Sequence, residues 1–163
     1  VIEHAWRHHG LKTVLTGGGS TQERELGEQI RRLLDPDAVV DAIGGTSLKG
    51  LLAMIRGARA LVAPDTGPVH MANALGTPVV GLYATSNVDR TGPYLWRDFT
   101  VDCYADAVRN YLHKTRDEVT WGQRVRHPDA MSLIHAEDVI ERLGAVLEFA
   151  NPHPTTESSV DEV

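Results

Sequence analysis

Asp65, Thr66, Gly67 and His70 offer, within six positions, the groups that bind a phosphorylated sugar. The Asp65 carboxylate can accept hydrogen bonds from sugar hydroxyls, and the His70 imidazole can donate one to a phosphate oxygen. Thr66 and Gly67 place a hydroxyl group and a bare backbone where an anion can approach closely. The alternative interpretation is that Asp65 or Thr66 only caps a helix and that His70 is a packed surface histidine.

The segment around these residues is predicted to form one βαβ unit. Residues 60–63 and residues 79–83 are short apolar runs, which are typical of buried parallel strands. Residues 68–75 are predicted to form a helix between them, because proline stands at its first position and Gly76 follows its end. Ligands of open parallel sheets bind beyond the carboxyl ends of the strands, where the first amides of such a helix face an anion.

A second candidate loop, residues 17–20, consists of three glycines and a serine between a strand predicted at residues 13–15 and a helix predicted at residues 21–34. Gly18 offers an amide to a phosphate or sugar, and the Glu23 carboxylate can accept from a ligand hydroxyl. Glu23 also stands three positions after Ser20, the spacing of a capping box, so its alternative role is to begin the helix. The loop has neither the Walker nor the dinucleotide glycine pattern.

A third loop, residues 44–48, follows a strand predicted at residues 38–43 and therefore falls at the same sheet edge. Thr46, Ser47 and Leu48 lie where a nucleotide base could bind. Ser47 is also predicted to cap the helix that follows.

That helix, predicted at residues 48–56, carries an apolar stripe at positions i, i+3, i+4 and i+7. We expect the stripe to be core. Its members are Leu48, Leu51, Leu52 and Ile55.

A fourth loop, residues 85–94, follows the strand predicted at residues 79–83 and is rich in hydroxyl groups and turn formers. Thr85 is placed near a ligand at the sheet edge. Arg90 is the best cation of this loop for a diphosphate, because a guanidinium group binds phosphate oxygens with two hydrogen bonds. An exposed arginine without a ligand is the equally acceptable alternative.

The rest of the chain supplies further elements around this edge. Periodicity predicts helices at 1–9, 105–114 and 135–149 and a strand at 99–103, whereas 115–128 shows no pattern. Residues 1–150 are expected to form one Rossmann-like α/β domain, an open parallel sheet flanked by helices. The tail 151–163 is rich in Pro, Ser, Thr and acids, so we expect it to be disordered.

Composition excludes several classes of protein. With 163 residues, 42% apolar and 23% charged, the chain has the size and balance of one globular domain. A net charge of −6 argues against a nucleic-acid partner. Cys103 is the only cysteine, which favours a reducing compartment, and the scattered histidines suggest no metal site. No apolar run is long enough to span a membrane. A chain that begins with Val1 suggests a piece of a longer protein.

Residues 65–83, DTGPVHMANALGTPVVGLY, resemble the signature of the lipopolysaccharide heptosyltransferases, which use ADP-heptose as donor. The glycines of residues 17–19 followed by Glu23, and Thr85 followed by Gly92 and Pro93, fall in the order that this family shows. The resemblance covers most of residues 11–102. It implies the C-terminal, donor-binding half of a GT-B glycosyltransferase, which is built of two Rossmann-like domains.

The family pattern, carried over by position, gives each candidate a role. It implies that Asp65 binds sugar hydroxyls, that the amides of Thr66 and Gly67 bind the diphosphate, and that His70 is a further donor contact. It implies that Glu23, beside Gly18, holds the ribose or base side.

The remaining candidates follow from the same resemblance. Residues 46–48 would lie near the adenine, and Thr85, with Arg90 in the same loop, near the phosphates. No residue of the chain matches the family's catalytic aspartate, which belongs to an N-terminal acceptor domain.

The resemblance therefore implies a donor-binding domain that transfers nothing by itself. Its partners would be the nucleotide sugar, the acceptor domain and a lipopolysaccharide core acceptor, at the cytoplasmic face of the inner membrane, with ADP-heptose as a substrate and no cofactor or metal. Two alternatives are half of a nucleotide-sugar 2-epimerase-like enzyme and a nucleotide-sugar-binding protein without chemistry.

Overall fold

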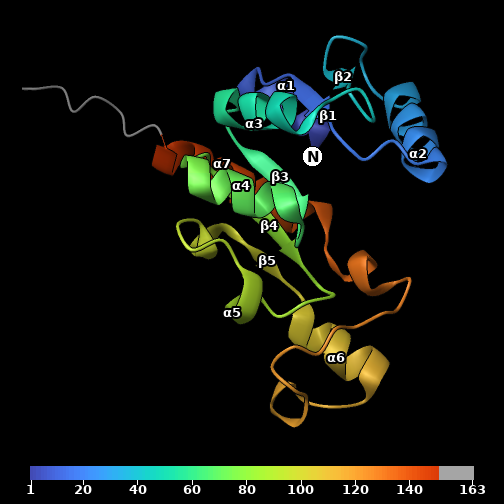
Figure 1. The fold of residues 1–163 in the computed structure, drawn as a ribbon, viewed down its shortest axis with the longest axis vertical. Coiled ribbons are helices and arrows are strands. Elements are labelled where there is room, and N and C mark those ends of the chain that lie inside the picture. The colour runs from blue at the N-terminus through green and yellow to red at the C-terminus, as the bar shows by residue number, and fades with distance from the viewer. Residues whose placement is uncertain (151–163) are drawn as a thin grey trace, which may run out of the picture.

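The computed structural model describes residues 1–150 and shows an α/β arrangement in which helices flank short parallel strands (Figure 1). The predicted disordered tail, 151–163, lies outside the described residues. The strands are β1 (Thr13–Leu15), β2 (Val39–Asp41), β3 (Leu61–Pro64), β4 (Val79–Tyr83) and β5 (Val101–Asp102). The helices are α1 (Ile2–His9), α2 (Thr21–Arg32), α3 (Leu48–Gly57), α4 (Gly67–Leu75), α5 (Val88–Thr91), α6 (Tyr104–Leu112) and α7 (Ala136–Ala150).

The strands form two hydrogen-bonded ladders, β1-β2 and β3-β4-β5, and every pairing is parallel. Leu61 of β3 lies opposite Val79 of β4, and Leu82 of β4 lies opposite Val101 of β5. The predicted parallel α/β fold is confirmed, and its strands are divided between two ladders. Periodicity identifies strands but not their partners, and within residues 1–150 both β1 and β3 pair on one side only.

The predicted βαβ unit is present as β3, α4 and β4, and it forms the centre of the main core. Val79 and Val80 of β4 are fully buried, as are Val69 and Ala72 of α4. Such double-sided burial explains why β4 reads as a continuous apolar run. Helix α4 ends at Gly76, as the sequence predicts.

Helix α7 covers this core and completes it (Figure 1). Val139, Leu143 and Val146 of α7 pack in the same cluster as β4. A second, smaller cluster joins Tyr104 and Val108 of α6 to Val125. It fixes a segment of the chain in which the sequence shows no periodicity.

One prediction about burial is wrong. Leu48, expected in the core stripe of α3, is 62% exposed, whereas Ile55 of the same stripe is buried. Leu48 is the first residue of α3, one position after its cap, so the stripe reaches the core only from the second turn onward. Helix α2 ends at Arg32, two residues before the end of the predicted helix 21–34, and Leu26 and Leu33 are exposed.

Candidate functional site

Asp65 directly follows β3 and points into the protein rather than into solvent, because its side chain is only 6% exposed. Its Oδ2 accepts a hydrogen bond from Nη2 of Arg124 at 3.1 Å. Its Oδ1 lies 3.7 Å from Nε2 of His70, one turn into α4. The carboxylate is thus held between two cationic or potentially cationic groups, which is what a nearly buried carboxylate requires.

Tyr83, at the carboxyl end of the neighbouring strand β4, lies close enough to Asp65 for the two groups to interact electrostatically. Burial is the main cause that raises the pKa of the Tyr83 phenol well above its usual range, and the Asp65 charge adds to it. The hydroxyl group therefore stays protonated and donates to the carbonyl of Thr91 at 2.9 Å. This bond ties the end of the loop after β4 back to its own strand.

Thr66 occupies the cap position of α4, but its side chain makes no capping hydrogen bond. Its hydroxyl donates instead to the carbonyl of Pro64 at 3.0 Å. The alternative that Thr66 or Asp65 serves only as a side-chain cap is therefore wrong, because neither side chain accepts from the helix amides.

Gly67 begins α4, where the amides of the first turn have no acceptor within the helix. A Cβ atom placed on Gly67 would meet only the end of the Met71 side chain, at 3.8 Å. The protein itself leaves room for a side chain there. A glycine at this exposed position keeps the helix start open to a ligand.

The loop after β1 is organised by Glu23. Its Oε1 accepts from the Gly18 amide at 2.9 Å, and its Oε2 accepts from the amide and hydroxyl of Ser20 at 3.0 and 2.7 Å. These bonds, the Ser20 hydroxyl first, lower the pKa of Glu23 to about 2. The predicted capping box is confirmed. A ligand hydroxyl would have to donate to a Glu23 oxygen that already accepts a hydrogen bond from Gly18 or Ser20.

The third loop packs directly against the second. Gly44 donates its amide to the carbonyl of Gly17 at 3.1 Å, and a Cβ on Gly19 would lie 2.7 Å from the Cα of Gly44. Only glycines allow two backbones to approach so closely. Thr46, Ser47 and Leu48 follow this contact, and Ser47 caps α3 through the Gly50 amide.

The loop after β4 reaches a segment that the sequence left unassigned, residues 120–127. The carbonyl of Thr85 accepts from the Val125 amide at 3.0 Å, and the Tyr104 hydroxyl donates to the carbonyl of Gln123 at 2.7 Å. Val125 is buried. These contacts fix the backbone on either side of Arg124, which places its side chain at Asp65.

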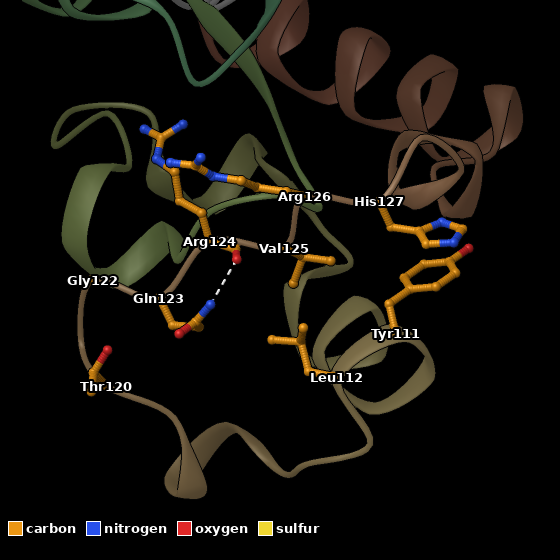
Figure 2. A pocket seen from close by; sticks show the side chains of 9 residues that line it. All are labelled: Tyr111, Leu112, Thr120, Gly122, Gln123, Arg124, Val125, Arg126 and His127. Atoms are coloured by element: carbon orange, nitrogen blue, oxygen red, sulfur yellow. Dashed lines mark hydrogen bonds between the residues drawn. The ribbon is translucent and has the colours of Figure 1, made fainter.

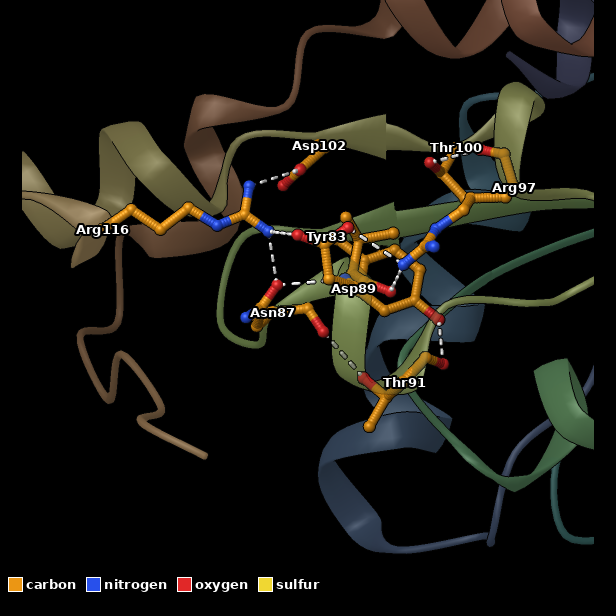
Figure 3. Close-up of polar contacts among 9 residues, drawn as sticks. Tyr83, Asn87, Asp89, Thr91, Arg97, Thr100, Asp102 and Arg116 are labelled. Atoms are coloured by element: carbon orange, nitrogen blue, oxygen red, sulfur yellow. Dashed lines mark hydrogen bonds and ion pairs between the residues drawn. The ribbon is translucent and has the colours of Figure 1, made fainter. Parts of the chain in front are cut away.

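A network of charged groups holds the same loop from the other side (Figure 3). Arg116 donates to Asn87 at 2.6 Å, pairs with Asp89, and lies 3.8 Å from Asp102. Arg97 pairs with Asp89 at 2.9 Å. Asp89 is thereby shared by two arginines, so the loop that carries Arg90 is fixed although Arg90 itself is exposed.

A pocket of about 580 Å³ is lined by Tyr111 and Leu112 of α6 and by residues of the 120–127 segment (Figure 2). Arg124 and Arg126 point to one side of the segment, whereas Val125 points to the other, toward Leu112. His127 stacks on Tyr111 with ring centroids 4.0 Å apart.

The structure thus brings the candidate residues together in two groups. One contains Gly18 and Glu23 with the neighbouring loop of Thr46, Ser47 and Leu48. The other contains Asp65, Thr66, Gly67 and His70, with Thr85 and Arg90 joined to them through the 120–127 segment.

Sequence reasoning missed Arg124. It lies 59 positions from its partner Asp65, in a stretch without periodicity, so no local signal identifies it.

Residues 1–150 contain neither a metal-binding cluster nor a membrane-spanning helix. Among these residues no three or more His, Cys, Asp or Glu side chains are arranged to hold a metal ion. None of the helices there is both long and apolar enough to cross a bilayer.

Comparison with known proteins gives consistent results. The family model of glycosyltransferase family 9 (heptosyltransferase) matches residues 1–146. The chain is 32% identical over 135 residues to a lipopolysaccharide core heptosyltransferase of Haemophilus influenzae, covering 83% of this chain and 39% of that protein. It is 40% identical over 135 residues to lipopolysaccharide heptosyltransferase 1 of Pseudomonas aeruginosa, covering 79% of this chain and 37% of that protein.

A solved structure agrees with these matches. The ADP-heptose lipopolysaccharide heptosyltransferase II of Escherichia coli superposes with a TM-score of 0.62 and 26% identity, over 90% of this chain and 39% of that one. The chain thus spans about two fifths of the length of the relatives that it matches. The parallel strands, the helices around them and the match over residues 1–146 together show that the chain belongs to glycosyltransferase family 9, the heptosyltransferases.

Proposed function

We propose that this chain is the donor-binding half of an inverting GT-B glycosyltransferase that moves heptose, or a related sugar, from ADP-heptose to the lipopolysaccharide inner core. The observation that carries the proposal is the turn after β3. There, Asp65 is held between Arg124 and His70, and the helix that follows opens with an exposed glycine. Membership of the family supports a nucleotide-sugar ligand, and one solved relative is described as acting with ADP-heptose.

In this proposal the amides of Thr66 and Gly67 bind the diphosphate, and His70 donates to it. Their position at the positive end of α4 favours an anion. Asp65 serves the sugar side. Its Oδ2 already accepts from Arg124, so we assign the sugar hydroxyl to Oδ1, which lies 3.7 Å from Nε2 of His70.

The other loops hold the rest of the nucleotide. Gly18 and Glu23 serve the ribose or base side, residues 46–48 lie by the adenine, and Thr85 and Arg90 lie by the phosphates. The Gly18 amide donates to a carboxylate oxygen of Glu23, and this orientation toward an anionic oxygen supports the assignment. No cofactor or metal enters this scheme.

The reaction itself needs groups from outside this chain. A general base of an acceptor domain would remove the proton of an acceptor hydroxyl, whose oxygen then attacks the anomeric carbon. The bond from that carbon to the diphosphate breaks, ADP leaves, and the configuration inverts. The amides at the start of α4 stabilise the charge that develops on the leaving group, which is where catalysis gains most. The reaction would take place on the cytoplasmic side of the inner membrane, and this chain alone would transfer nothing.

Two alternatives use the same loops. Half of a nucleotide-sugar 2-epimerase-like enzyme would also bind its ligand at this edge, and a binding protein without chemistry would keep the fold. Activity of the full-length gene product on a lipid A–inner-core acceptor separates them, because an epimerase would interconvert free nucleotide sugars and a binding protein would give no product.

The direct test is calorimetric titration of the protein with ADP, followed by transfer assays on full-length Asp65→Ala. We expect ADP to bind, and we expect the substitution to lower transfer by at least about tenfold, because it removes the partner of Arg124. Absence of ADP binding, or full activity of Asp65→Ala, contradicts the proposal.

A further inference from the structure

The 120–127 segment gathers positive charge in a chain whose net charge is −6. Arg124 and Arg126 extend on the same side of it (Figure 2). Arg90 reaches it from α5, since a Cβ on Gly122 would lie 3.8 Å from the Arg90 guanidinium carbon. Three guanidinium groups from two distant parts of the sequence thus border one segment.

These cations are largely uncompensated. Arg124 pairs with Asp65 and remains 47% exposed, and within residues 1–150 neither Arg90 nor Arg126 takes part in an ion pair. The two arginines of the neighbouring network differ in this respect, because Arg97 and Arg116 both pair with Asp89. Cations left exposed beside a helix start favour an anionic ligand.

The segment is also held in place, which a binding site requires. The Thr85 carbonyl and the Tyr104 hydroxyl fix its backbone, and Val125 anchors it in the second core cluster. Asp65 fixes the Arg124 side chain, so part of its conformational entropy is already lost before a ligand binds. The anchoring points alternate with the arginines along the segment, so the charged side faces away from the core.

We propose that Arg124 and Arg126, with Arg90 beside them, bind the diphosphate of the nucleotide sugar together with the helix amides. This inference rests on the proposed function and names residues for it that the sequence pattern did not. A diphosphate fits because Asp65, the partner of Arg124, immediately precedes Thr66 and Gly67. A guanidinium group there can bind two phosphate oxygens at once, which a helix amide cannot.

The test measures binding of ADP and of inorganic pyrophosphate by calorimetry, at low and high salt. The variants are Arg124→Gln and Arg126→Gln, and the matched control is Arg109→Gln, an exposed arginine of α6 paired with Asp106. We expect each of the two variants to weaken both ligands by about tenfold and to reduce the salt dependence, and the control to match the wild type. Because Arg126 has no ion pair in the described part of the chain, its replacement breaks no such contact of the fold.

The outcomes distinguish failure of this inference from failure of the proposed function. Unchanged ADP binding by both variants overturns the inference while the proposed function stands. Pyrophosphate binding that depends on Arg124 and Arg126, without ADP binding, supports the anion site and overturns the nucleotide-sugar function. Failure of the wild-type protein to bind either ligand overturns both. Should Arg124→Gln melt at a lower temperature than the wild type, Arg126→Gln and Arg124→Lys, which keeps the charge, decide the question.

Discussion

Glu23 organises the loop after β1 through both oxygens of its carboxylate. Both of its oxygens accept hydrogen bonds from the loop after β1, and these bonds lower its pKa to about 2 from an ordinary value of 4.5. The charged form is therefore favoured in the folded protein. The sequence predicted both the capping box and a ligand role, and the capping box is confirmed. The ligand role stays a prediction.

The depressed pKa of Glu23 predicts how stability depends on pH. Its contribution is fully present above about pH 4.5 and is lost as pH falls toward 2, because the unfolded chain binds the proton first. We expect Glu23→Gln to lower the free energy of unfolding at pH 7 and to make it less dependent on pH between 4.5 and 2. Urea unfolding at several pH values checks this.

The matched control is Glu25→Gln, an exposed carboxylate on the same helix. It should leave the curve close to that of the wild type. Parallel curves for Glu23→Gln and the wild type down to pH 2 would show that the carboxylate charge does not stabilise the loop.

At the same scale, Asp65 and Arg124 mark the limit of sequence reasoning. Asp65 could be identified because it lies in a local pattern of strand, turn and helix. Arg124 could not, because a contact over 59 positions is set by the tertiary structure.

At the scale of elements, β3, α4 and β4 were predictable because every signal in them is local. An apolar run, a proline at the helix start and a glycine at its end each act within a few residues. The 120–127 segment is different, because its backbone is held by the Thr85 carbonyl, which accepts a hydrogen bond from it, and by the Tyr104 hydroxyl, which donates one to it, and both residues are distant in sequence. The burial of Leu48 was predicted wrongly, because periodicity shows which face of a helix is apolar but not how deeply each residue of that face is buried.

Thr77 joins two of these elements and offers a test. It is buried after α4, and its hydroxyl donates to the carbonyl of Ile55 in α3 at 2.9 Å. We expect Thr77→Val to lower the free energy of unfolding by about 1 kcal/mol, because it removes this hydrogen bond. The cost stays this small because the Ile55 carbonyl still accepts from the Ala58 amide.

Thr100→Val serves as the control, since the Thr100 hydroxyl makes a similar bond to Arg97 at the surface. It should cost only a few tenths of a kcal/mol. Urea unfolding measures both variants, and an equal cost would show that burial of the Thr77 bond does not matter.

At the scale of the whole molecule, the two ladders are unequal. The main core cluster is built from β3, β4, β5 and the helices that cover them, and no residue between Leu11 and Leu51 belongs to it. The β1-β2 ladder has two strands, and Val14 and Val40 in it are exposed. Two strands with little apolar cover are marginal by themselves.

This inequality predicts where the protein opens first. We expect backbone amides of β1 and β2 to exchange with deuterium well before those of β4, because they lie outside the main core. Hydrogen exchange followed by mass spectrometry checks this. Equal protection of the two ladders would show that a single cooperative unit includes both.

The divided ladder also changes what ADP would do to the molecule. The proposed function assigns the base side of ADP to loops of the β1-β2 ladder and its phosphates to loops of the β3-β4-β5 ladder. The nucleotide would therefore act as a crosslink between the two ladders. Binding to the folded form alone stabilises it by mass action, and here the gain falls mainly on the part that opens first. The bound nucleotide would then complete the architecture of the domain that receives it.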